Sequence, residues 1–237
     1  MASRSAVIDS FAYDRYVNDW GKSPETIDMI GAINLDEDIK KARSYDREEN
    51  RKTLLGSPVA KTITFACQPL PDIEIMAAIH AIATNLKQRK TIHLCVKLHP
   101  SQSEWLLGHI SEYLMAELED KSRFTVLRNV SFAKVISVTD ILVSHFSNVC
   151  LMAPAFNVPV IALPSSAPMP SLTLADMGLA IAAETLDDFG DKLDQILSNL
   201  QTDNKSLPPH PYLDKNPHMK TPDSLKRLTE IVRKGFN

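Results

Sequence analysis

Glycine is scarce in this sequence, with seven residues among 237, whereas proline reaches fifteen. The few glycines form neither a GxGxxG dinucleotide fingerprint nor a GxxxxGKS/T phosphate loop. A GxSxG nucleophile elbow is also absent. The sequence therefore lacks the signatures of dinucleotide-binding proteins, P-loop proteins and α/β-hydrolases.

Cysteine is equally rare, and the three residues Cys67, Cys95 and Cys150 show no CxxC spacing. Each lies in or beside an apolar run, which is where a packed, reduced thiol is found. An odd number of such residues does not suit a disulfide framework, and without paired ligands a zinc site is not expected. We therefore expect three buried free thiols and an intracellular protein.

Neither sign of charge dominates, because 26 basic residues face 29 acidic ones, with a net charge of −3 and a pI near 6.2. This balance argues against nucleic acid as a partner. The sequence has no apolar run long enough to span a bilayer and no apolar core of a signal peptide. We expect a soluble protein without a transmembrane segment, located in the cytoplasm or at the inner face of the membrane.

Apolar strands alternate with amphipathic helices over most of the chain. This order predicts an α/β fold with a Rossmann-like, doubly wound parallel sheet. The expected strands are 62–67, 92–98, 124–127, 141–143, 159–163 and 179–182, and the expected helices are 72–90, 104–118, 131–137 and 186–200.

The two ends of the chain follow other patterns. Residues 6–8 and 27–30 are expected to form short strands separated by a helix that Gly21 ends. A single charged helix is expected over 36–55, a surface loop over 203–217, and a final basic helix from Pro222 to Lys234.

Right-handed crossovers place every strand-to-helix loop of a parallel sheet at one edge. Four such loops, 68–69, 99–100, 144–148 and 164–166, carry polar residues or proline directly after apolar strands. Ligands of doubly wound sheets bind in the crevice at the carboxyl ends of the strands. We therefore expect these loops to face a common site.

The residue types in these loops suit phosphate. His99 can donate an N–H, Ser144 and Ser147 can donate hydroxyl protons, and the amides at 147–149 add donors where Ser147 or Asn148 caps a helix. Neutral donors of this kind stabilise a leaving phosphate as its charge develops.

Other interpretations of the same residues stay open. His99 could cap its own strand, His145 could point to solvent, and the ordinary interpretation of Lys97 is a solvated strand lysine rather than an ammonium at the crevice. His99 and His145 lack the spacing of a metal pair. A hydrolytic pair of Ser144 or Ser147 with His99 lacks a third, orienting residue. We expect neither a metal nor a cofactor.

The motif order strand–QP, KLHP, SxxSNVxLxA and NxPVIAL resembles the C-terminal, donor-nucleotide half of GT-B glycosyltransferases. Nearest are the bacterial capsule and lipopolysaccharide sialyltransferases and β-Kdo transferases, which share an HP motif and a serine motif. CDP-glycerol polymerases and UDP-sugar 2-epimerases are similar in outline. The resemblance covers about residues 27–236.

The resemblance implies a Rossmann-like domain over 32–237 that binds a nucleotide sugar, CMP-linked or else UDP- or CDP-linked. It implies transfer to a polysaccharide or glycolipid acceptor of the cell surface. Residues 1–31 are then a hinge segment, the link to an N-terminal domain whose place a separate acceptor-binding domain or chain could take. The implied nucleotide-binding residues are Gln68, His99, Pro100, Ser144, Ser147 and Asn148, with His99 stabilising the leaving phosphate.

The sequence departs from the family pattern after the serine motif. Met152 replaces a glutamate that holds the ribose, Pro154 falls inside the expected helix, and Asn157 replaces a glycine. Two alternatives therefore remain: a catalytically inactive partner-binding module, and a nucleotide-sugar epimerase or hydrolase. The latter needs an acid near the crevice, for which Asp140 and Asp176 are the candidates.

Overall fold

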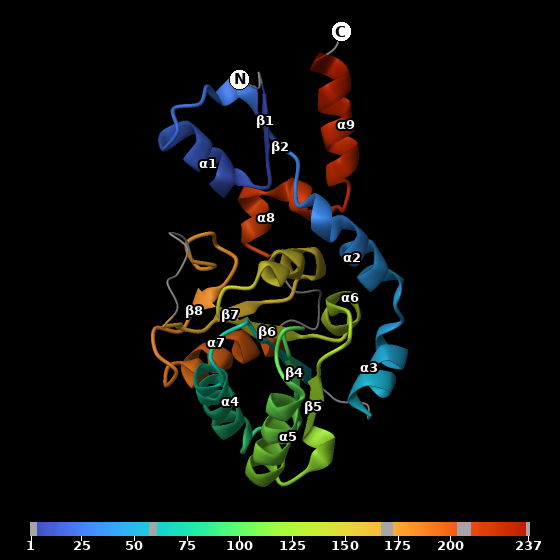
Figure 1. Ribbon diagram of the computed structural model, residues 1–237, viewed down its shortest axis with the longest axis vertical. Helices are drawn as coiled ribbons and strands as arrows, with labels where there is room; N and C mark the ends of the chain where they lie inside the picture. Colours follow the sequence, from blue (N-terminus) through green and yellow to red (C-terminus); the bar gives the residue numbers. More distant parts are fainter. Residues whose placement is uncertain (1–3, 57–60, 167–172, 203–209, 236–237) are drawn as a thin grey trace.

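The computed structural model describes residues 4–56, 61–166, 173–202 and 210–235. In this part of the chain, parallel strands form a six-stranded sheet in the order β5-β4-β3-β6-β7-β8 (Figure 1). The predicted α/β doubly wound fold is confirmed. The strands are β3 (Lys61–Ala66), β4 (Ile92–Lys97), β5 (Phe124–Leu127), β6 (Ile141–Ser144), β7 (Val160–Ala162) and β8 (Ile181–Ala182).

The direction in which the sheet grows reverses beside β3. The chain first adds β4 and β5 on one side of β3, and then returns to add β6, β7 and β8 on the other. The crossovers that follow β3 and β6 therefore run in opposite directions. This reversal opens a crevice between the loops at the carboxyl ends of those strands.

Helices cover both faces of the sheet. One face packs against α4 (Asp72–Leu86), α5 (Glu104–Leu118) and α7 (Phe189–Thr202). The other face packs against α2 (Ile33–Ser44), α3 (Arg47–Leu55), α6 (Phe132–Ile136), the 3₁₀ segment η3 (Asn148–Phe156) and α8 (Tyr212–Lys215).

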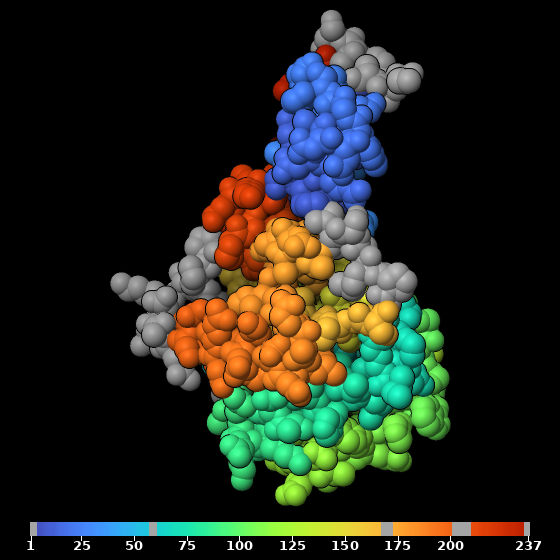
Figure 2. Space-filling model, turned by 90° about the vertical axis from the view of Figure 1, so that its left-hand side faces the viewer, coloured from blue at the N-terminus to red at the C-terminus, as the bar shows by residue number. Residues whose placement is uncertain are grey.

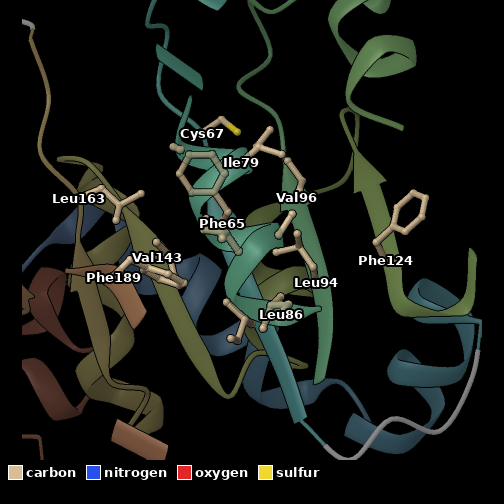
Figure 3. Close-up of a cluster of buried hydrophobic side chains, with 14 of the residues drawn as sticks. Phe65, Cys67, Ile79, Leu86, Leu94, Val96, Phe124, Val143, Leu163 and Phe189 are labelled. Atoms are coloured by element: carbon tan, nitrogen blue, oxygen red, sulfur yellow. The ribbon is translucent and has the colours of Figure 1, made fainter. Parts of the chain in front are cut away.

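The strand pattern explains the two cores. Ile63 and Phe65 of β3 point to the first face, where Phe65 lies among the buried side chains of α4 and α7 (Figure 3). Thr64 and Ala66 alternate to the second face, as successive strand residues do. The three cysteines are buried and unpaired, as predicted.

The helix predicted over 36–55 is in fact two helices, so that prediction is wrong in one respect. Tyr45 between them is extended, and the Asp46 carboxylate accepts a hydrogen bond from the Glu49 amide at 2.8 Å. Because the short side chain of Asp46 can cap a new helix, it favours the start of α3 over the continuation of α2. Gly56 ends α3 in the left-handed conformation, and the rest of the predicted break lies outside the described residues.

Two other segments also differ from simple expectation. Pro154 lies inside η3, which is a 3₁₀ segment rather than an α-helix, in line with the predicted disruption. The described part of the predicted loop 203–217 contains α8. Tyr212 and Leu213 are buried there, and the Tyr212 hydroxyl donates to Asp9 at 2.6 Å, so this prediction is wrong because a distant segment anchors the turn.

The N-terminal segment forms a lobe of its own. Strands β1 (Ser5–Val7) and β2 (Ile27–Met29) make a separate two-stranded parallel sheet, connected by α1 (Ser10–Asn18) and the 3₁₀ turn η1 (Pro24–Thr26). Figure 2 shows this lobe standing above the body of the molecule. The last elements, η4 (Pro217–Lys220) and α9 (Ser224–Gly235), return to it (Figure 1). No helix among the described residues is long and apolar enough to cross a membrane.

Candidate functional site

A cleft of about 450 Å³ lies at the carboxyl ends of β3 and β4, where the sheet reverses direction. Loops that follow β5 and β6 complete its walls. Five of the six residues predicted to bind a nucleotide line it together: Gln68, His99, Pro100, Ser147 and Asn148. The described lining contains no acidic side chain. The cleft is therefore suited to an anion.

His99 presents a free N–H donor. Its Nδ1 accepts a hydrogen bond from the Ser101 amide at 3.2 Å and lies 2.7 Å from the Ser101 hydroxyl. Because Nδ1 is an acceptor, the neutral ring carries its proton on Nε2. That nitrogen has no partner among the described residues, so it can donate to a ligand.

Gln102, which was not singled out from the sequence, fixes the two loops beside this histidine. Its buried side-chain oxygen accepts from the His99 amide at 2.7 Å, and its side-chain nitrogen donates to the Gln68 carbonyl at 3.1 Å. One amide group thus connects the loop after β3 to the loop after β4. No local pattern identifies such a contact, because it joins segments 34 residues apart.

Ser147 caps the start of η3 on the other side of the cleft. Its backbone is extended and its side chain accepts from the Val149 amide at 3.4 Å, which confirms the predicted cap. Asn148 is exposed at the same turn. The first amides of a helical segment carry a partial positive charge that favours anions.

Ser144 does not reach the cleft. Its side chain is fully buried, and its hydroxyl donates to the Ala66 carbonyl at 2.8 Å. This bond ties the end of β6 to the end of β3. The structure thus separates Ser144 from the five residues with which it was grouped in the sequence.

Lys97 is buried rather than solvated, so the ordinary sequence interpretation is wrong. Its ammonium donates to the carbonyls of Leu98 and Arg128, both at 2.7 Å, while the residue also lines the cleft. Burial lowers the pKa of this amine, because the charged form loses water. Helices α3 and α6 pack over the face of the sheet on which Lys97 lies. The sequence of β4 alone does not predict this packing.

His145 does not point to solvent, which was one interpretation that the sequence left open. Its ring is 1% exposed, stands edge-on to Phe65 with centroids 5.7 Å apart, and finds no hydrogen-bond partner among the described residues. Burial lowers its pKa. The neighbouring strands β3 and β7 enclose β6, so the residue that follows it is covered.

The two acids named from the sequence do not face the cleft. Asp140 precedes β6, at the opposite edge of the sheet, where it pairs with Arg47 and Arg51. Asp176 accepts hydrogen bonds from the backbone and hydroxyl of Thr173. Both carboxylates stabilise local structure.

Among the described side chains, no group of three or more His, Cys, Asp or Glu residues could hold a metal ion. Cys67 lines the cleft, but burial raises the pKa of its thiol and disfavours the thiolate that binds metals.

Comparison with known proteins gives structural neighbours only. No family model and no curated protein matches the sequence. Similar solved structures include UDP-GlcNAc 2-epimerase from Neisseria meningitidis bound to UDP-GlcNAc (TM-score 0.68, 11% identity) and a glycosyltransferase from Rickettsia africae (0.61, 14%). The wall teichoic acid polymerase TagF is a third (0.60, 10%). In each comparison 98% of this chain is covered.

These neighbours are nucleotide-sugar enzymes of the GT-B fold, and the fold is what the likeness shows. The chain spans 62%, 61% and 57% of the lengths of the three neighbours. The matched structures thus contain a large part that this chain does not align with.

Proposed function

We propose that this chain is the donor-binding part of a glycosyltransferase, which moves a sugar from a nucleotide to a polysaccharide or glycolipid acceptor of the cell surface. The observation that carries the proposal is the acid-free cleft at the reversal point of the sheet, into which His99, Ser147 and Asn148 place hydrogen-bond donors. The likeness to GT-B enzymes supports the same assignment.

The two ends of the cleft suit the two ends of a nucleotide. The loop after β6 offers the Ser147 hydroxyl and amides of η3 to the phosphates, with His99 Nε2 as a further donor. The loop after β5 offers the half-buried ring of Phe132 and the side chain of Val130 to the flat base. When the sugar is transferred, these donors stabilise the negative charge that develops on the leaving phosphate. No metal or cofactor belongs to this proposal.

Two different observations indicate which nucleotide to test. The serine and HP motifs resemble those of enzymes that use CMP-sugars, whereas a named structural neighbour holds UDP-GlcNAc. We therefore propose a pyrimidine nucleotide, with UDP-linked and CMP-linked sugars as the two donors to compare first and CDP-linked donors as the third.

The acceptor side of the reaction is proposed to come from a second domain or chain that packs on the N-terminal lobe. A two-stranded parallel sheet is rarely stable when it stands alone. In this lobe the apolar residues Ile8, Trp20 and Met29 are exposed by 39%, 59% and 38%. A partner that packs on the lobe would cover them. Such a partner would supply the acceptor site and the catalytic base.

Calorimetric titration of the purified chain with UDP, CDP and CMP tests the proposal. One nucleotide should bind, and His99→Ala or Ser147→Ala should weaken its binding about tenfold or more, since a hydrogen bond to a charged group contributes roughly 1.5–3 kcal/mol. Ser144→Ala is the matched control, because this buried hydroxyl faces Ala66 and should leave the affinity unchanged. The proposal is wrong if the wild-type protein binds none of the three nucleotides.

A second candidate is a nucleotide-sugar epimerase or hydrolase, favoured by the 2-epimerase among the structural neighbours. It requires conversion of UDP-GlcNAc without an acceptor, which nuclear magnetic resonance of the products can detect.

A third candidate is an inactive partner-binding module. It is favoured by Met152, whose side chain is fully buried in the second core and leaves no carboxylate at that position to hold a ribose. Nucleotide binding without turnover, with the second domain present, would select this candidate.

A further inference from the structure

A second cluster of polar groups lies along the edge of the sheet that carries the cleft. Glu74 belongs to the first turn of α4, which follows β3, His145 follows β6, and Ser165 and Ser166 follow β7. These three strands are consecutive in the sheet. Their carboxyl ends therefore bring the four residues together beside the cleft, with His145 only two positions from Ser147.

Hydrogen bonds from the serines hold the Glu74 carboxylate in place. Its Oε1 accepts from the Ser165 hydroxyl at 2.7 Å and from the Ser166 amide at 3.0 Å, and its Oε2 accepts from the Ser166 hydroxyl at 2.7 Å. A carboxylate offers about four acceptor sites. Since Oε2 uses one site and the side chain is partly exposed, it can accept one more hydrogen bond from outside.

The charge state of Glu74 decides what it can do. Burial raises the pKa of this carboxyl, but the hydrogen bonds from Ser165 and Ser166 and the nearby His145 outweigh that effect, so the pKa is lowered. The group stays ionised at neutral pH. It is therefore a poor proton donor or base and a good acceptor for hydroxyl groups.

The buried side chain of His145 is the second notable feature of this cluster, after the Glu74 carboxylate. The ring is 1% exposed and close enough to Glu74 for their charges to interact, yet neither nitrogen has a partner among the described residues. Buried nitrogens without partners are uncommon and costly. His145 is thus a second polar group near Glu74, and both of its nitrogens lack a hydrogen-bond partner among the described residues.

We propose that Glu74, positioned by Ser165 and Ser166 and near the buried His145, binds hydroxyl groups of the sugar of a nucleotide sugar. The inference rests on the proposed function, since it assigns the other end of the same donor. Its chemistry complements the cleft: phosphate oxygens only accept hydrogen bonds and are repelled by a carboxylate, whereas sugar hydroxyls donate. The donor thus lies along the sheet edge, with its phosphates at Ser147 and its sugar at Glu74.

Two calorimetric titrations, with UDP and with UDP-GlcNAc, test the assignment. CMP and CMP-sialic acid form the second pair if the protein selects cytidine. Glu74→Gln keeps the shape of the side chain and removes its charge. It should weaken binding of the nucleotide sugar about tenfold and change binding of the free nucleotide less than twofold.

Ser166→Ala should weaken the same ligand selectively, because Oε2 of Glu74 then loses the hydrogen bond that the Ser166 hydroxyl donates to it. Glu112→Gln, an exposed position on α5, is the matched control and should change neither affinity. Melting temperatures of all variants establish that each is folded.

The outcomes separate the two proposals. If the wild-type protein binds a nucleotide but gains nothing from the attached sugar, or if Glu74→Gln weakens both ligands equally or neither, the sugar subsite is wrong and the cleft stands. If no nucleotide binds at all, the proposed function fails and this inference fails with it.

Discussion

At the scale of single residues, His93 couples stability to pH. The ring is 1% exposed, its Nδ1 donates to the Ser122 carbonyl at 2.9 Å, and its Nε2 accepts from the Thr125 hydroxyl at 3.0 Å. Both bonds suit the neutral ring. Burial lowers the pKa of His93 to about 4, so the folded protein resists protonation that the unfolded chain accepts near pH 6.5.

The sign of the effect follows from this difference. Between pH 6.5 and about 4 the unfolded state binds the extra proton, so the free energy of unfolding falls as the pH is lowered. We expect His93 alone to account for about 2 kcal/mol of loss between pH 7 and pH 5. His93→Asn cannot titrate, so urea unfolding at the two pH values should show a correspondingly smaller loss.

The control for this prediction is His109→Asn, which removes an exposed histidine of α5 that stacks on Trp105. It should keep the wild-type dependence on pH. An equal loss in wild-type protein and His93→Asn would contradict the assignment of the low pKa to the buried ring.

At the scale of an element, the end of η3 depends on one left-handed residue. Asn157 has φ 53° and ψ 33°, and the Val158 amide after it donates to the Ala153 carbonyl at 3.0 Å. The left-handed conformation is open to glycine and tolerated by asparagine, but costs other residues roughly 1–2 kcal/mol. The turn is needed because β7 starts only three residues later.

We therefore expect Asn157→Gly to leave the free energy of unfolding nearly unchanged and Asn157→Val to lower it by about 1–2 kcal/mol. Urea denaturation followed by circular dichroism measures both. A valine variant as stable as the glycine variant would show that the turn relaxes to another conformation.

At the scale of the whole molecule, one buried carboxylate ties the end of the chain to its beginning. Asp36 of α2 accepts from the Ser224 amide at 2.7 Å and from its hydroxyl at 2.9 Å. Arg227 donates to the Ile30 carbonyl at 2.7 Å beside them. A Cβ at Gly31 would lie only 2.5 Å from the Ser224 hydroxyl oxygen, so this close approach needs glycine.

Asp36→Ala should release α9 from the body of the protein, because it leaves two buried donors without an acceptor, at a cost of about 1–3 kcal/mol each. Trypsin should then cleave after Lys226 and Arg227 faster than in the wild-type protein. Glu37→Ala, at the exposed neighbouring position, should be cleaved at the wild-type rate. Equal cleavage of the two variants would mean that other contacts hold α9.

Local patterns in the sequence predict the order of strands and helices and five of the residues that line the cleft. Strand alternation and helical periodicity are local patterns, and loops that follow parallel strands meet at one edge whatever packs around them. Gln68, His99 and Ser147 could therefore be grouped from their positions along the chain alone. Tyr45 to Asp46 could not be placed, because a cap and a continuing helix compete over a single residue.

Tertiary packing determines which of these polar side chains a ligand can reach. Ser144 and His145 follow the same strand pattern as residues that reach the cleft, yet both are buried. Lys97 lines the cleft, but its ammonium is taken up by two backbone carbonyls. Glu74 showed no signal beyond the first turn of a helix, and only β7 brings the serines that hold it. Burial and pairing depend on the sum of such remote contacts, whereas a local pattern records only the face on which a residue lies.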